Sequence, residues 1–81
     1  MNRQEIKAKV DAFLVGELEI DEAKISDDAL LKKDLGIDSL DLVDIIVLIK
    51  NEFGVKVEAS DLGRLQTLGN LYDFIKQKIQ A

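Results

Sequence analysis

The segment 38–53 is predicted by its periodicity to be a helix with apolar side chains on two opposite sides. At about 100° per residue, one side carries Leu42, Ile45, Ile46, Ile49 and Phe53. The opposite side carries Leu40, Val43 and Val47, next to Asp44. A small protein buries one such face in its core, so the second face is left for a partner, a ligand or another segment of the chain.

The composition restricts the fold class further. With 81 residues, the chain is expected to form a single domain, 1–81, with one modest core. Hydrophobic residues make up 47% and charged residues 33%, a balance that excludes an intrinsically disordered chain. Proline is absent and aromatic residues make up 5%, which favours helices over a turn-rich β fold. Cysteine is also absent, which excludes disulfides and thiolate metal sites.

Two long helices have recognisable first and last residues. Asn2 is a suitable N-cap for a first helix that ends near Gly16, and Asp38 and Asp41 suit the start of the helix over 38–53. Gly54 is placed to end that second helix. The apolar face of the first helix consists of Ile6, Val10, Phe13 and Leu14. Because this N-terminal segment is charged and amphipathic, we expect no signal peptide, no membrane span and a cytoplasmic location.

The C-terminal third predicts a short helix followed by a longer one. Ser60 or Asp61 is expected to open the short helix, which holds Leu62 and Leu65. Thr67 is expected to cap the last helix. The apolar face of that helix consists of Leu68, Leu71, Tyr72, Ile75 and Ile79. The sequence therefore predicts three longer helices and one short helix.

A long loop is expected between Gly16 and Asp38, where apolar periodicity is lost over roughly twenty residues. A short helical turn can form near residues 27–33. The side chains expected to attach the loop to the core are Ile20, Ile25, Leu30, Leu31 and Leu35. An alternative use for these side chains is to cover the second apolar face of the helix over 38–53.

The net charge of -5 is concentrated in the middle of the chain. Counted from the sequence, residues 1–16 carry +1, residues 17–61 carry -8 and residues 62–81 carry +2. The acidic middle surrounds Ser39, which disfavours nucleic acid and anionic membranes as partners and favours basic protein surfaces. The alternative is that these acids only keep the protein soluble.

Ser39 follows Asp38 at the start of the second helix, and the chain offers no base that would make this serine a catalyst. Histidine is absent, and the carboxylates nearby are surrounded by like charge. A hydroxyl at a helix start can also serve simply as a cap. We therefore expect no enzymatic activity and no catalytic residue.

The acids before and after Ser39 only partly resemble a helix-loop-helix calcium loop. Counted from Asp34, the pattern has Gly36 at position 3, where a ligand belongs, Ser39 in place of the turn glycine and Ile45 in place of the bidentate glutamate. We expect no metal site, although loose binding of divalent ions by Asp27-Asp28 or by the acids from Glu17 to Glu22 stays open as an alternative.

Three stretches together resemble the acyl carrier protein family across nearly the whole chain. They are Asp34-Leu35-Gly36-Ile37-Asp38-Ser39-Leu40-Asp41, the helix that follows to Phe53-Gly54-Val55, and Thr67-Leu68-Gly69-Asn70-Leu71-Tyr72-Asp73-Phe74-Ile75. The resemblance implies an all-α, small four-helix bundle with a long loop between the first and second helices. It also implies that Ser39 carries 4′-phosphopantetheine, installed from coenzyme A by a separate phosphopantetheinyl transferase, with acyl groups held on its thiol as thioesters.

The resemblance assigns further roles around Ser39. The residues implied to dock partner enzymes are Asp38, Leu40, Asp41, Val43, Asp44 and Val47. The residues implied to line a shelter for the acyl chain are Leu42, Ile46 and Leu68. Expected partners are the transferase and acyl-transfer and chain-elongation enzymes with basic docking patches, and the carrier itself is expected to be a monomer.

Two features bear on the cargo and the pathway. The second half of the docking helix reads Lys50-Asn51-Glu52, where housekeeping members of the family are usually acidic, so a specialised lipid or polyketide pathway is an alternative to fatty acid synthesis. Asp38 before the serine favours acyl over aminoacyl cargo. A peptidyl or aminoacyl carrier stays open as a second function, and an unmodified helical adaptor that binds partners through its two-faced helix stays open as a third.

Overall fold

The computed structural model describes residues 2–80, and the side chains of residues 2–79, as an all-α fold. Its elements are α1 (Arg3–Gly16), the 3-10 helix η1 (Glu22–Lys24), α2 (Ser39–Phe53), the 3-10 helix η2 (Ala59–Arg64) and α3 (Leu68–Gln80). No β-strand occurs within the described residues, and Leu30 and Thr67 form an isolated bridge. The predicted arrangement of three longer helices and one short helix, η2, is confirmed.

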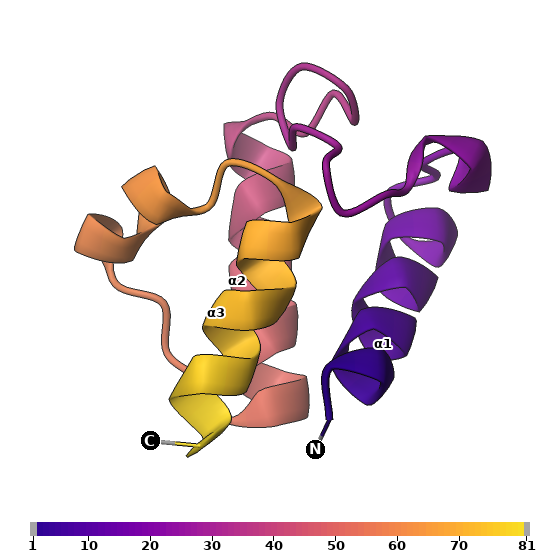
Figure 1. Ribbon diagram of the computed structural model, residues 1–81. Helices are drawn as coiled ribbons and strands as arrows, with labels where there is room; N and C mark the ends of the chain where they lie inside the picture. The colour runs from indigo at the N-terminus through magenta and orange to yellow at the C-terminus, as the bar shows by residue number, and fades with distance from the viewer. Residues whose placement is uncertain (1, 81) are drawn as a thin grey trace.

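The three long helices lie side by side, with α3 in contact with both α1 and α2 (Figure 1). Helix α1 runs in the direction opposite to α2 and α3, so the start of α1 and the end of α3 lie at one end of the molecule (Figure 1). The loop between α1 and α2 crosses the other end, where α2 begins (Figure 1). Ser39 therefore lies at the end of the bundle that this loop covers.

Local capping contacts explain where the long helices begin and end. The Asn2 side chain accepts a hydrogen bond from the Glu5 backbone N–H at 2.8 Å, as the sequence predicts for α1. Thr67 and Asn70 cap α3 reciprocally, each side chain accepting from the other residue's backbone N–H at 3.1 Å. Helix α2 ends at Gly54, whose φ of 67° lies in the left-handed region that glycine adopts at little cost.

The core lies between the three long helices. Its fully buried side chains are Ile6, Val10, Leu14, Ile45, Ile49, Leu68, Leu71, Tyr72 and Ile75. The Tyr72 hydroxyl donates a hydrogen bond to the Asp11 carboxylate, which satisfies the polar group at the edge of this core. Burial raises the pKa of Tyr72 well above its usual value, and the hydrogen bond to Asp11 raises it further, so the phenol is neutral in the folded protein.

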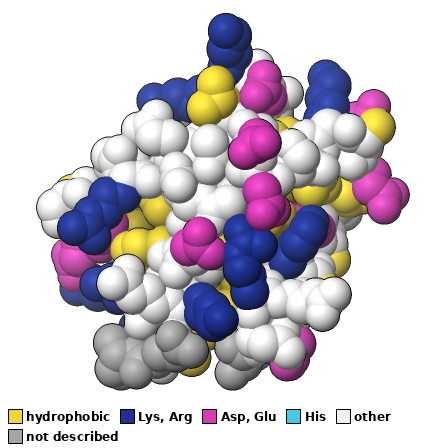
Figure 2. All heavy atoms as spheres, viewed as in Figure 1, with side chains coloured by type: hydrophobic (Ala, Val, Ile, Leu, Met, Phe, Trp, Pro, Cys, Tyr) yellow, Lys and Arg dark blue, Asp and Glu magenta, His cyan; other side chains and the backbone are white. Residues whose placement is uncertain are grey.

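Charged side chains of both signs are interspersed on the face formed by α3 and α1, and several of them pair (Figure 2). Arg3 pairs with Asp73 at 2.7 Å and with Asp27 at 3.0 Å, which joins α1 to α3 and to the long loop. The hydrogen bond to Asp73 is the main cause of a raised pKa at Arg3. Each surface pair of this kind contributes little to stability. Charges of both signs occur on this face, whereas the charges of residues 17–61 are mainly negative.

The long loop is attached to the core by some of the predicted side chains. Ile20, Leu31 and Leu35 are buried as expected, whereas Ile25 is half-buried and Leu30 is exposed. Ala29 and Ile37, which the sequence analysis did not single out, are also buried in this region. Leu40, Val43 and Val47 form the outer face of α2. The loop does not hide this face, since the three side chains are 77%, 54% and 50% exposed. The alternative in which the loop covers that face is therefore wrong.

The backbone of the loop is held at the start of α3. The Leu31 N–H bonds the Gln66 carbonyl at 3.0 Å, and the Leu68 N–H bonds the Ala29 carbonyl at 3.0 Å. These bonds hold residues 29–31 beside the start of α3. The turn predicted near residues 27–33 forms a few residues later, where the Leu30 carbonyl accepts from the Asp34 N–H at 2.9 Å and the Lys32 carbonyl accepts from the Gly36 N–H at 3.1 Å. The 3-10 helix η1, which the sequence analysis did not predict, begins where the Asp21 carboxylate accepts from the Ala23 N–H at 3.0 Å.

Candidate functional site

Ser39 is the first residue of α2, and its neighbours perform the capping that a serine could otherwise perform. The Asp38 carboxylate accepts from the Asp41 N–H at 2.9 Å, and the Asp41 carboxylate accepts from the Asp38 N–H at 3.4 Å. This reciprocal pair is a capping box built from two aspartates. Ser39 is thus placed by the cap without being part of it.

The Ser39 hydroxyl is exposed and has no hydrogen-bond partner among residues 2–80. The backbone N–H groups of Ser39 and Leu40 also make no hydrogen bond within that part of the chain. Free N–H groups and the positive end of a helix dipole favour a phosphate group. The hydroxyl is therefore accessible to another protein, and a phosphoryl group attached to it would lie against a favourable helix end.

The outer face of α2 presents the residues that the sequence predicts for partner docking. Leu40, Val43 and Val47 form an exposed apolar strip, and Asp44 lies beside it with its carboxylate exposed. Asp38 is exposed and Asp41 is half-buried, both occupied by the capping box. The structure brings all six residues to the Ser39 end and outer side of one helix. Their role in docking stays a prediction.

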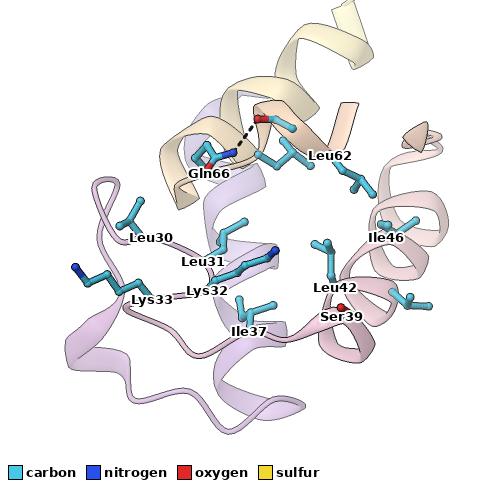
Figure 3. A pocket seen from close by; sticks show the side chains of 13 residues that line it. Leu30, Leu31, Lys32, Lys33, Ile37, Ser39, Leu42, Ile46, Leu62 and Gln66 are labelled. Atoms are coloured by element: carbon cyan, nitrogen blue, oxygen red, sulfur yellow. Dashed lines mark hydrogen bonds between the residues drawn. The ribbon is translucent and has the colours of Figure 1, made fainter. Parts of the chain in front are cut away.

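A cleft of about 690 Å³ opens beside Ser39, between the start of α2, the end of the long loop and η2 (Figure 3). Its walls are mainly apolar. The lining residues are Leu30, Leu31, Lys32, Lys33, Ile37, Ser39, Leu42, Val43, Ile46, Leu62, Gly63, Leu65 and Gln66. Because Ser39 itself is part of the lining, a group attached to its hydroxyl has direct access to an apolar space.

Two of the three residues predicted to line an acyl shelter lie in this cleft. Leu42 and Ile46 form its α2 wall, and both are half-buried (Figure 3). Leu68 does not line it, because this first residue of α3 is fully buried in the core. Helical periodicity shows that Leu68 faces inward, but it does not distinguish a core position from a cavity wall.

The opposite walls come from segments that the sequence analysis did not connect with the site. Leu31 and Ile37 lie in the loop before α2, and Leu62 and Leu65 lie in and just after η2. The short helix begins at Ala59 after the cap residue Glu58, slightly earlier than the predicted Ser60 or Asp61. The apolar pair Leu62 and Leu65 was the available signal, but only the tertiary fold places it opposite Leu42.

The described residues contain no group of three or more His, Cys, Asp or Glu side chains arranged to hold a metal ion. The acids nearest Ser39 bond backbone N–H groups instead, as Asp38 and Asp41 do. In the same part of the chain, no helix is long and apolar enough to cross a membrane.

Comparison with known proteins agrees with this arrangement. A family model described as the phosphopantetheine attachment site matches residues 8–75. An acyl carrier protein from Thermotoga maritima is 41% identical over 78 residues, which cover 96% of each chain. One from Thermosynechococcus vestitus is 37% identical over 81 residues, which cover 100% of each chain. A crystal structure of an acyl carrier protein from Thermotoga maritima matches the fold with a TM-score of 0.82, at 22% identity, covering 99% of this chain and 93% of that one.

These matches define a small helical domain of the phosphopantetheine-binding class. The chain belongs to the acyl carrier protein family. Members of this family act as carriers and not as catalysts, and they work with transferases and acyl-processing enzymes.

Proposed function

We propose that the chain carries acyl intermediates on a 4′-phosphopantetheine arm attached to Ser39, for fatty acid synthesis or a related lipid or polyketide pathway. The observation that carries the proposal is the position of Ser39, whose unpartnered hydroxyl lies at the start of α2 and on the lining of the cleft. When bound, the arm supplies a terminal thiol on which acyl groups are held as thioesters. The chain itself supplies the attachment point and has no catalytic role.

The attachment reaction requires only a hydroxyl from this protein. The Oγ atom of Ser39 forms a bond to the phosphorus of coenzyme A that bears the pantetheine. The phosphoanhydride bond breaks, 3′,5′-adenosine bisphosphate leaves with the bonding electron pair, and the hydroxyl proton passes to a base on the transferase. The chain offers no histidine and no hydrogen-bonded base at Ser39, which supports a division of labour between two proteins.

The cleft supports acyl cargo because its size and lining suit an apolar chain. Leu42 and Ile46 provide the α2 wall, and Leu31 and Leu62 face them from the loop and from η2 (Figure 3). Leu65, just after η2, also lines the cleft. Each methylene removed from water is stabilised by about 0.8 kcal/mol. An acyl chain that folds back from the arm into this space is therefore expected to be sheltered from water.

The proposal is tested by the mass of the intact protein. Incubation with coenzyme A and a broad-specificity phosphopantetheinyl transferase is expected to add the mass of one phosphopantetheine group. Fragmentation of the product is expected to place the added mass on the peptide that contains Ser39. Unchanged mass under conditions that modify a known carrier would contradict the proposal.

Val43→Arg or Val47→Glu is expected to lower kcat/KM for modification by the transferase at least about tenfold, equivalent to about 1.4 kcal/mol of transition-state stabilisation. Both side chains are half or more exposed on the outer face of α2, so a charged replacement obstructs an apolar docking contact without disturbing the core. The initial rate of mass gain measures the effect.

Ala8→Arg on the exposed side of α1 is the matched control, because it adds the same charge as Val43→Arg to an exposed helix position away from α2. It is expected to leave the modification rate within about twofold of wild type. Circular dichroism melts are expected to show folded protein for all three variants. Loss of the fold in Val43→Arg and Val47→Glu would place these residues in the core and rule out the docking role.

A further inference from the structure

Two lysines lie on the wall of the cleft that faces α2, in a region where most charged residues are acidic. Lys32 and Lys33 follow the buried Leu31 at the end of the long loop. Figure 3 shows the Lys32 side chain extending across the cleft toward the wall that holds Leu42 and Ser39, whereas Lys33 points away from it. Of the two lysines, Lys32 is therefore the one whose side chain extends into the cleft that Ser39 also lines.

The backbone that carries Lys32 is held by hydrogen bonds on both sides. The Lys32 carbonyl accepts from the Gly36 N–H at 3.1 Å, and Leu31 bonds Gln66 through its N–H and Ile37 through its carbonyl, at 3.0 and 2.9 Å. Leu31 is 3% exposed, which fixes the chain against the core at this point. Only the side-chain torsions of Lys32 remain to be ordered when its ammonium group binds an anion.

No carboxylate of the described residues pairs with Lys32. The acids nearest in sequence are used elsewhere, since Asp34 accepts from the Leu30 N–H at 2.8 Å and Asp38 and Asp41 bond each other's N–H groups. The cleft lining contains no acid at all. Lys32 is exposed and has no carboxylate partner within the described residues, so its ammonium group is available to pair with an anionic group at the cleft.

We propose that Lys32 is a positioning residue that pairs with an anionic oxygen of the phosphodiester on Ser39 and so holds the arm toward the cleft. This inference rests on the proposed function, because it requires the arm. The phosphodiester carries one negative charge and Lys32 supplies one positive charge. The free N–H groups of Ser39 and Leu40 contact the phosphate from the helix side, and Lys32 contacts it from the loop side.

As the anionic partner of Lys32, the phosphodiester is favoured over a carboxylate on the cargo for a geometric reason. The phosphorus is bonded directly to the Ser39 Oγ atom, so its position is fixed beside the cleft wall. A cargo carboxylate lies beyond the thiol at the far end of a long flexible arm. Pairing at the phosphate orders the base of the arm, and the chain beyond it then enters the cleft from the Ser39 side.

The experiment uses the modified protein as wild type and with Lys32→Gln, Lys32→Arg, Lys33→Gln and Lys24→Gln. Its first readout is the phosphorus-31 NMR resonance of the phosphodiester at low and high salt. In wild type and Lys32→Arg, the resonance is expected to move with salt as the pair is screened. In Lys32→Gln the low-salt resonance is expected to lie where the high-salt wild-type resonance lies. Lys24→Gln removes one exposed positive charge from η1, outside the cleft, and is expected to match wild type.

The second readout is the rate at which hydroxylamine cleaves an octanoyl thioester loaded on each variant. Lys32→Gln is expected to raise the rate roughly two- to fivefold at low ionic strength, the range of a single solvent-exposed ion pair. The difference is expected to disappear near 1 M salt, where the Debye length is about 3 Å. Lys32→Arg is expected to restore the wild-type rate, and Lys33→Gln is expected to have a smaller effect than Lys32→Gln.

Each remaining outcome contradicts the inference. Equal effects of Lys32→Gln and Lys33→Gln would show a general effect of charge and not a directed contact. An effect of Lys32→Gln that occurs only with a succinyl thioester, and is absent from the phosphorus resonance, would assign Lys32 to the cargo carboxylate. Failure of every variant and of wild type to gain the mass of the arm would overturn the proposed function and this inference together. A mass gain with no difference among the variants would overturn this inference alone.

Discussion

Ser39→Ala is expected to abolish modification by the phosphopantetheinyl transferase completely and to leave the fold unchanged. The loss is complete because the hydroxyl oxygen is the atom that bonds to phosphorus, and alanine has no nucleophilic atom to replace it. The fold is unaffected because the side chain is exposed and Asp38 provides the cap. The free energy of unfolding is expected to change by no more than about 0.5 kcal/mol. Intact mass and urea denaturation measure the two quantities.

Ser26 and Ser60 provide matched controls, since both are exposed serines in the same chain. Ser60 also lies in a helix, η2, preceding Asp61. Ser26→Ala and Ser60→Ala are expected to gain the full mass of the arm at the wild-type rate. Modification that persists in Ser39→Ala but disappears in either control would show that the arm is attached to that other serine and not to Ser39.

The positions of the long helices could be predicted because local interactions fix them. Asn2, Thr67 and the Asp38–Asp41 pair cap helices through contacts three residues apart, and Gly54 ends α2 by adopting a positive φ. Such contacts depend on residue type and spacing, which a single sequence contains. The position of Ser39 at the start of α2 could be predicted for the same reason, since its place after a capping aspartate is a local property.

The cleft could not be predicted because its walls come from segments far apart in the chain. Leu42 and Ile46 lie on α2, and Leu31 and Leu65 reach them from the loop and from the residue after η2. Apolar periodicity predicted an inward direction for Leu42 and Leu68 equally. The bond between the Leu68 N–H and the Ala29 carbonyl places the start of α3 inside the core, and no local pattern contains that contact.

The charge pattern was also informative only in part. The excess of acidic residues over residues 17–61 indicated the region around Ser39 as a docking surface. Lys32 is one of the few basic residues in that segment. Lys32 follows Leu31, whose N–H bonds the carbonyl of Gln66, thirty-five positions away in the sequence. The net charge of residues 17–61 does not show which way the Lys32 side chain points.

Ile49→Ala is expected to lower the free energy of unfolding by about 2 to 5 kcal/mol, the range for removing a large aliphatic side chain from a core. Ile49 is 0% exposed and lies among the side chains that join α2 to α3. A chain of this length is typically stable by roughly 4 to 12 kcal/mol, so the substitution removes a large share of the total. Urea denaturation measures the effect through the midpoint, with the m-value unchanged if the native state stays compact.

Ile46→Ala distinguishes the contribution of α2 to the cleft from its contribution to the core. Ile46 is one turn away from Ile49 but lies half-buried on the cleft wall. It is expected to cost about 1 to 2 kcal/mol of stability, since less of its surface is buried in the folded protein. It is also expected to raise the rate at which hydroxylamine cleaves a loaded octanoyl thioester, because a cleft wall is lost. Equal losses of stability in the two variants, with no change in thioester cleavage, would show that Ile46 belongs to the core and not to the cleft.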